Sequence, residues 1–286
     1  MADSEVAPPA RPVGEERDGN VRALARGLAV LQVINRKGSV SMMEIARGAA
    51  IPYPTACRIV QTLIELGMVE REPGRKRYRP TPMVLTLSRG YSAEDELVRV
   101  ARPYLVELTR RFLWPVSLST RVGSYMMVRD STHRLTTLTL HNYAPGFTLP
   151  IVECASGKAY LAFCDPEERA LILQGLFALD GPAERMGRLL LAEPTLLERI
   201  RAQGHATQAR NVYTAHPGKT SSLAVPVFRD DRVVGALALI FFASAMRMRE
   251  AEERFAPALK ATAHDITQAL AATSRHGAGP EAPQGG

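Results

Sequence analysis

The 286-residue sequence has only three cysteines, Cys57, Cys154 and Cys164, and no CxxC pair. This sparse, odd number argues against a disulfide framework and predicts reduced thiols, packed as small apolar side chains in a cytoplasmic protein. No apolar run approaches the roughly 18 residues that a membrane span needs, which predicts no membrane association. Residues 1–20 lack the apolar core of a secretory signal.

Catalytic and metal-binding motifs are also missing. Gly218-Lys219-Thr220 has the end of a phosphate-binding loop, but Tyr213 stands where the first glycine of GxxxxGK[ST] is required. The GxSxG, HExxH and GxGxxG patterns do not occur. No spacing supports a triad of Cys154 with His133 and His141. The sequence therefore predicts no catalytic residue, no metal site and no cofactor.

Positive charge is concentrated in one part of the chain. Residues 21–90 hold 12 Lys and Arg against 4 Asp and Glu, whereas residues 91–286 hold 22 against 20. A basic segment of domain size beside a nearly neutral one indicates a module that binds a polyanion, joined to a domain with another task. On charge alone, a merely solvated basic surface is the alternative.

Residues 21–82 have the pattern of a winged helix-turn-helix. Apolar residues recur at helical spacing in three segments, residues 21–35, 42–49 and 54–66. Ser41 and Glu44 form a capping box before the second helix. Two short basic strands, residues 68–71 and 76–79, are expected around a Pro73-Gly74 turn. Three helices and a charged hairpin in this order predict a DNA-binding domain.

The third helix is expected to enter the major groove of double-stranded DNA, where each base pair shows a distinct pattern. Arg58 can donate a bidentate pair to a guanine edge. Further contacts with bases or phosphates are expected from Arg22, Arg26, Ser41, Tyr53, Pro54, Thr55, Thr62, Arg75, Lys76 and Arg77. As alternatives, Arg58 is a solvated helix residue, and Arg71 and Arg79 pair with Glu70 or Glu72 across the hairpin.

The rest of the chain mixes strands and helices without a repeat. Strands are expected over residues 116–120, 125–128, 135–140, 223–228 and 233–242. Helices are expected over residues 82–89, 94–112, 155–163, 166–176, 194–203 and 250–271. The fold class is therefore α+β, in which linker helices at residues 83–112 lead to a sensor domain with a mixed sheet and flanking helices at residues 113–273. Residues 1–20 and 274–286 are expected to be disordered tails.

Two groups of residues resemble the IclR family of bacterial transcription regulators. The helices and wing of residues 22–80 are similar to its DNA-binding half. Leu149-Pro150 and the run Ala155-Ser156-Gly157-Lys158-Ala159-Tyr160-Leu161-Ala162 are similar to its effector-domain signature. The resemblance covers about residues 20–272. It implies a GAF-like effector domain, a homodimer through the DNA-binding domains or a homotetramer, and a palindromic operator.

Five short segments narrow the resemblance to family members that activate the catabolism of 3-(3-hydroxyphenyl)propionate. They are Trp114-Pro115, Val128-Arg129, Thr132-His133-Arg134, residues 161–164 and residues 243–246. This likeness implies an aromatic carboxylate as effector and activation, with RNA polymerase as a partner. A repressor responding to another metabolite is the alternative. An enzyme with an appended DNA-binding domain is the remote one.

The resemblance also implies an effector cavity between the sheet and the signature helix. Backbone N–H groups of Ala155, Ser156 and Gly157 at the helix start would favour a carboxylate. Ser222, Ala238 and Ile240 would face the same cavity. Ala238 and Ile240 stand where some relatives have serines, which makes the cavity more apolar and suits an aromatic ring.

No motif selects the charge partner or phenol contact of the effector. The candidates are Arg121, Arg129, His133, Arg210 and Tyr213. For Ser156 and Gly157, ordinary strand-to-helix packing is the alternative.

Overall fold

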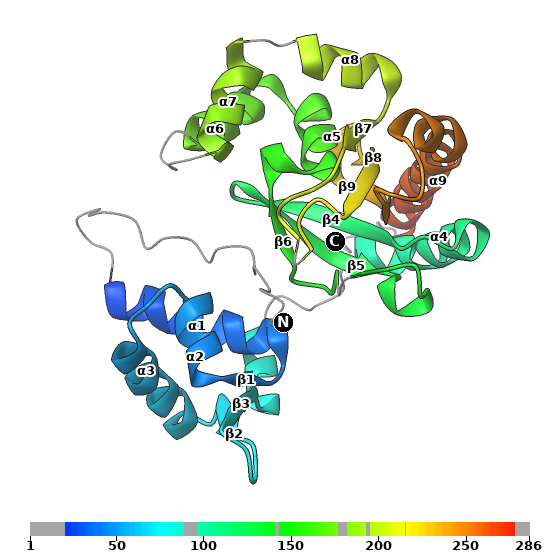
Figure 1. Cartoon of the computed structure of the whole chain (residues 1–286). Coiled ribbons are helices and arrows are strands. Elements are labelled where there is room, and N and C mark those ends of the chain that lie inside the picture. Colours follow the sequence, from blue (N-terminus) through cyan, green and yellow to red (C-terminus); the bar gives the residue numbers. More distant parts are fainter. Residues whose placement is uncertain are drawn as a thin grey trace, which may run out of the picture. The chain divides into compact units, whose positions relative to one another are not determined.

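The computed structural model describes residues 21–88, 96–140, 143–176, 182–192, 195–214 and 216–277 (Figure 1). The chain divides into two compact units, Met1–Glu94 and Asp95–Gly286. Among the described residues, no helix is long and apolar enough to cross a membrane. The tails predicted at residues 1–20 and 278–286 lie outside the described residues, whereas residues 274–277 continue the last helix.

The first unit combines three helices with a small antiparallel sheet. Its elements are α1 (Arg22–Lys37), β1 (Val40–Ser41), α2 (Met42–Gly48), α3 (Tyr53–Glu65), β2 (Val69–Arg71), β3 (Arg77–Pro80) and a 3-10 helix, η1 (Pro82–Ser88). Strand β3 pairs with β1 on one side and β2 on the other. The winged helix-turn-helix predicted from the sequence is confirmed, with β1 as an addition because two residues show no periodicity.

Local chemistry fixes the helix start and the wing turn of this unit. The Ser41 hydroxyl accepts from the Glu44 N–H at 3.3 Å, and the Glu44 carboxylate accepts from the Ser41 N–H at 2.7 Å, which completes the predicted capping box. Gly74 has φ +70°, and the Arg75 N–H donates to the Glu72 carbonyl, as a type II turn requires.

The second unit is built on a six-stranded sheet with the order β6-β5-β4-β9-β8-β7, in which all neighbours run antiparallel. Its strands are β4 (Val116–Val122), β5 (Tyr125–Ser131), β6 (Thr148–Pro150), β7 (Ala206–Gln208), β8 (Thr220–Arg229) and β9 (Arg232–Phe242). Its α-helices are α4 (Glu96–Phe112), α5 (Ala155–Phe163), α6 (Pro166–Leu176), α7 (Pro182–Ala192), α8 (Thr195–Gln203) and α9 (Met248–Gly277). Two 3-10 helices, η2 (His133–Leu135) and η3 (Ile151–Glu153), join them.

The two faces of this sheet have different residue sizes. On β8 and β9 the large side chains of Leu223, Val225, Leu237 and Leu239 pack with α4 and α9. The alternate positions are small, including Ala224, Ala236 and Ala238, and they pack with α5. Because successive strand residues point to opposite faces, the sequence pattern itself lets α5 approach one face closely. Figure 1 shows α4 and α9 on one side of the sheet and α5 on the other.

Two expectations for the second unit need correction. Residues 135–140 were predicted as a strand, but they form no strand: η2 ends at Leu135, and both Leu135 and Leu140 are exposed. Residues 83–112 were predicted as linker helices, yet α4 buries Leu97, Ala101 and Leu105 in the core that it shares with α9. Helix α4 is therefore an integral part of the second unit.

Candidate functional site

Helix α3 presents a polar face that has no packing role. Ala56, Val60 and Leu63 are buried, whereas Arg58 and Thr62 are exposed. The Thr62 hydroxyl donates to the Arg58 carbonyl at 3.1 Å, which leaves its oxygen able to accept. Within the described residues the Arg58 guanidinium takes part in no ion pair, so its five donors face outward.

Five further predicted DNA contacts lie on α3 and α1. Tyr53 and Pro54 are exposed at the start of α3, and Thr55 is partly buried. The neighbouring Cys57 raises the pKa of the exposed Tyr53 phenol above its ordinary value. Arg22 lies exposed at the start of α1, and Arg26 is partly buried one turn later.

The cations of the wing differ in whether they form an ion pair. Arg75 and Lys76 are exposed at the tip. Arg79 forms an ion pair with Glu70 at 2.6 Å, which is one of the alternatives left open by the sequence.

Arg77 and Ser41 are used inside the fold, contrary to the expectation that both contact DNA. The Arg77 guanidinium donates to the Ser39 hydroxyl at 3.0 Å and to the Ser39 carbonyl at 2.8 Å, and it pairs with Glu44 at 3.2 Å. The Ser41 hydroxyl accepts from the Glu44 N–H and donates to its carboxylate. Both side chains therefore hold the wing against the start of α2.

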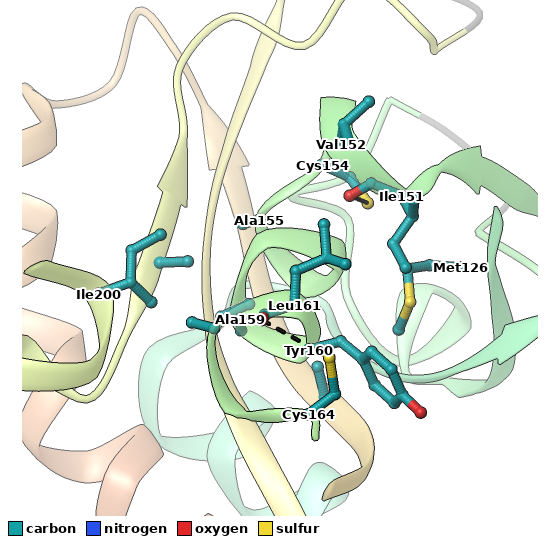
Figure 2. Close-up of a cluster of buried hydrophobic side chains, with 14 of the residues drawn as sticks. Met126, Ile151, Val152, Cys154, Ala155, Ala159, Tyr160, Leu161, Cys164 and Ile200 are labelled. Carbon is teal, nitrogen blue, oxygen red and sulfur yellow. Dashed lines mark hydrogen bonds between the residues drawn. The ribbon is translucent and has the colours of Figure 1, made fainter. Parts of the chain in front are cut away.

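The start of α5 is closed by protein atoms. Cys154 caps the helix, and its Sγ accepts from the Gly157 N–H at 3.4 Å. A Cβ at Gly157 would lie 1.8 Å from the Ile151 carbonyl oxygen, so only glycine fits there. Figure 2 shows Ile151 and Cys154 beside the start of this helix. The predicted carboxylate contact through the Gly157 N–H is therefore corrected to helix capping and close packing.

Ala155 and Ser156 are likewise buried in this packing. The Ser156 hydroxyl lies 3.4 Å from the Cys154 sulfur and forms a weak hydrogen bond with it. Burial, as the largest effect, raises the pKa of the Cys154 thiol, so Cys154 is a neutral capping group.

The predicted sheet residues do share one face. Ser222 pairs with Ile240 and Ala224 with Ala238, and Ala224 and Ala238 pack with α5. Since residues two apart on a strand share a face, Ser222 and Ile240 face the α5 side as well.

Two buried serines on β4, missed by the sequence reasoning, extend this face. Ser117 pairs with Ala238 and Ser119 with Ala236, so both hydroxyls point to the α5 side. The alternation in the run Val-Ser-Leu-Ser-Thr could have predicted this placement, because it puts both serines on the face of the strand that Leu118 does not occupy. Unlike the surface of an ordinary core, this face offers hydroxyls beside apolar side chains.

Arg121 approaches this face but is already neutralised. Its guanidinium pairs with Glu168 of α6 at 3.1 Å. Tyr160 of α5 donates its hydroxyl to the same Glu168 oxygen at 2.8 Å. The three side chains join β4 to α5 and α6, so Arg121 serves the packing of these helices.

The structure does not bring Arg129 and His133 to the α5 face. Arg129 donates to Thr120, which alternates with Ser119 and so points to the opposite face. His133 is buried in η2, where neither ring nitrogen has a hydrogen-bond partner among the described residues. Its charged neighbours include Arg102 of α4, which covers the other side of the sheet. Both residues are corrected to sites away from the signature helix.

Arg210 and Tyr213 lie on the loop between β7 and β8. Arg210 is exposed and lines a hollow of about 620 Å³ at the start of α9, together with Arg247 and Glu250. Tyr213 is partly buried near Glu153; burial, followed by this carboxylate, raises the pKa of its phenol.

The sequence reasoning also passed over Tyr143 and Lys158. Tyr143 is buried, and its hydroxyl lies 3.3 Å from that of Thr220 on β8. Burial raises the pKa of Tyr143 to about 12. Lys158 on α5 was named only as one residue of the effector-domain signature run. Among the described residues, no group of three or more His, Cys, Asp or Glu side chains is placed to hold a metal ion.

Each of the two units matches a known protein family. Residues 90–268 match the family described as bacterial transcriptional regulator IclR C-terminal, and residues 23–73 match the IclR helix-turn-helix domain. The chain is 28% identical over 253 residues to the Pca regulon regulatory protein of Pseudomonas putida, which covers 87% of this chain and 84% of that protein.

Two solved structures share the fold. An IclR family transcriptional regulator from Brucella abortus is 24% identical, with a TM-score of 0.62 and coverage of 88% of this chain and 93% of that one. An IclR homologue from Microbacterium hydrocarbonoxydans, complexed with 4-hydroxybenzoate, is 22% identical, with a TM-score of 0.60 and coverage of 87% and 99%. The matched families and relatives are regulators rather than enzymes, and this chain belongs to the IclR family of DNA-binding transcriptional regulators.

Proposed function

We propose that the regulator reads its operator with Arg58 of α3. The supporting observation is that Arg58 is exposed on the face opposite the buried Ala56 and Val60, with no ion pair among the described residues. Thr55, Thr62, Tyr53 and Pro54 would contact neighbouring bases or phosphates. Arg75 and Lys76 at the wing tip, with Arg22 and Arg26 on α1, would contact the phosphate backbone.

The first unit also carries an apolar stripe that suits a second copy of the chain. Val21, Leu24 and Leu28 on one side of α1 are 63%, 61% and 50% exposed. Exposed apolar side chains at helical spacing favour a helix-to-helix interface. A homodimer formed through α1, alone or within a homotetramer, would present two α3 helices to half-sites about one DNA turn apart. The operator would then be palindromic.

We propose that the second unit binds an aromatic carboxylate between α5 and the sheet. The observation that carries this proposal is the mixed character of the α5 face, where the buried hydroxyls of Ser117 and Ser119 lie beside Ala238 and Ile240. An apolar surface with a few convergent polar groups suits a ring that bears a hydroxyl or carboxylate. The 4-hydroxybenzoate complex concerns a protein that shares the fold with this chain.

The resemblance of five segments, among them Trp114-Pro115 and Thr132-His133-Arg134, to activators of aromatic catabolism supports a proposal for the sign of regulation. We propose that the chain activates such an operon through RNA polymerase once the acid is bound. Deletion should then lower expression of the neighbouring operon. Increased expression would instead indicate a repressor.

Fluorescence anisotropy on DNA from the upstream region tests the whole proposal. We expect salt-sensitive, sequence-specific binding that changes on addition of 3-(3-hydroxyphenyl)propionate or 4-hydroxybenzoate. Specific binding that ignores every aromatic acid would contradict the effector proposal while leaving the DNA-binding role intact.

A further inference from the structure

Lys158 of α5 is a partly buried cation whose ammonium is held by a neutral side chain. Its ammonium donates to the Oε1 of Gln208 on β7 at 2.6 Å, and this acceptor is a neutral amide. Within the part of the chain that the structure describes, no carboxylate forms an ion pair with it. A charge withdrawn from water is normally paired with an opposite charge. Burial lowers the pKa of Lys158, ahead of the opposing influence of Cys154 and Glu153.

The strand register places this cation beside the candidate effector face. Gln208 pairs with Ser222, and Ser222 pairs with Ile240. Gln208 lies two residues from Ala206, which packs with α5, so its side chain is on the α5 side of the sheet. The Lys158 ammonium therefore lies at the β7 end of the surface that carries Ser222, Ile240 and the β4 serines.

Chemical groups follow a simple order across this surface. The cation is at β7, the apolar Ile240 and Ala238 are on β9, and the hydroxyls of Ser117 and Ser119 are on β4. Strands β7 and β4 are three strands apart, about 14 Å at a spacing of ~4.8 Å, and Ser117 lies two residues along the sheet from the row of Gln208, Ser222 and Ile240, about 7 Å further. A hydroxyaryl acid has its carboxylate, ring and phenol group in the same order. An arylpropionate with a hydrogen bond at each end spans a comparable distance.

The other cations considered for this role are occupied or lie elsewhere. Arg121 is neutralised by Glu168, and Arg129 donates to Thr120 on the opposite face. Arg210 is exposed at the hollow beside α9. Among these cations, Lys158 combines partial burial and a position on the α5 face with the lack of an ion pair to any described carboxylate.

We propose that Lys158 is the residue that recognises the carboxylate of the effector, and that Gln208 holds its ammonium in the empty protein. The inference rests on the proposed effector function and names the charged contact of that site. On binding, the carboxylate takes the place of the Gln208 amide oxygen. The exchange is favourable because a hydrogen bond between two charged groups is roughly twice as strong as one to a neutral acceptor.

Calorimetric titration of the full chain tests the assignment with four ligands: 3-(3-hydroxyphenyl)propionate, 4-hydroxybenzoate and the primary amide of each. Lys158→Met removes the ammonium but keeps the aliphatic stem. We expect the Kd of the acids to rise about 10- to 100-fold, while that of the neutral amides changes by less than about threefold. Lys219→Met, at an exposed lysine, is the matched control and should leave every Kd unchanged.

Two further variants separate recognition from folding. Lys158→Arg keeps the charge and should restore much of the acid affinity. Gln208→Leu leaves the ammonium without its acceptor and should bind the acids at least as tightly as the wild type. Loss of acid affinity in Gln208→Leu would contradict the exchange, even if Lys158→Met fails to fold.

The outcomes distinguish this inference from the proposal on which it rests. Equal acid affinity in the wild type and Lys158→Met would overturn the role of Lys158 and leave the aromatic effector standing. Binding of an aliphatic acid such as pyruvate in its place, lost in Lys158→Met, would support Lys158 and overturn the aromatic assignment. If the wild type binds none of the acids, both proposals are wrong.

Discussion

Arg77 on β3 and Glu44 on α2 form an ion pair of 3.2 Å that joins the wing to the N-terminus of the second helix. The same guanidinium donates twice to Ser39, and the same carboxylate caps α2 through Ser41. The position of the wing therefore depends on a side chain that the basic pattern alone would assign to DNA.

Replacement of Arg77 by alanine is expected to lower the free energy of unfolding by about 1–2 kcal/mol, because it removes two hydrogen bonds and an ion pair. Urea denaturation of the two variants measures the effect. Arg75→Ala, two residues away at the exposed tip, should leave stability within about 0.5 kcal/mol of the wild type. Equal stability of the two variants would contradict the structural role of Arg77.

Arg58→Ala is expected to reduce the preference for operator over random DNA about 10- to 100-fold, because it removes donors that read a base edge. Lys76→Ala should weaken binding to both DNAs about equally and reduce the salt slope by about one. Anisotropy titrations at several salt concentrations measure both quantities. Unchanged operator preference in Arg58→Ala would mean that residues other than Arg58 read the operator.

Substitution of the α1 stripe tests the dimer. Leu24→Glu with Leu28→Glu places two charges in the proposed interface, so the assembly should dissociate in sedimentation experiments and operator affinity should fall. Leu171→Glu on α6 is a matched control, because that leucine is 70% exposed and belongs to the second unit. A double variant that sediments like the wild type would place the interface elsewhere.

Gly157→Ala is expected to destabilise the second unit by about 3 kcal/mol, since the added Cβ would lie 1.8 Å from the Ile151 carbonyl oxygen. Gly175→Ala, also on a helix but with nothing within 4 Å of the added Cβ, should raise stability by up to about 1 kcal/mol. Thermal and urea unfolding measure both changes. A stable Gly157→Ala protein would show that η3 can move away from α5.

Burial, ahead of the nearby cations Arg134 and Arg102 and against the opposing effect of Asp130, lowers the pKa of His133 from its ordinary value of 6.5. Because the unfolded imidazole then binds a proton more readily than the folded one, stability is retained above about pH 6.5 and declines as the pH falls below it. His133→Leu should flatten the dependence of the unfolding free energy on pH between about 6.5 and 5. His264→Leu, on the exposed face of α9, should keep the wild-type profile.

Regular local patterns explain which elements were predicted correctly. The bounds of α5 and α6 were predicted to the residue, and the capping box at Ser41 was confirmed, because capping and helical periodicity are properties of adjacent residues. Strands β6 and β7, three residues each, are too short for a periodic signal. Helix α7 was also missed. Residues 135–140 alternate in polarity like a strand, but no neighbouring strand pairs with them in the described part of the sheet.

Some features of the candidate sites likewise depend on local sequence, and others depend on tertiary contacts. The sequence by itself determined the basic DNA-binding unit, the exposed face of α3 and the contrast between large and small residues on β8 and β9, since these depend on composition and period. Only the tertiary structure decided which cations are available. Arg77 and Arg121 are neutralised by Glu44 and Glu168, which are 33 and 47 residues distant in the chain. Lys158 is partly buried and donates to the amide oxygen of Gln208, and this depends on how β7 meets α5. Availability of a charge is a property of what surrounds it in space, and spacing along the chain does not encode it.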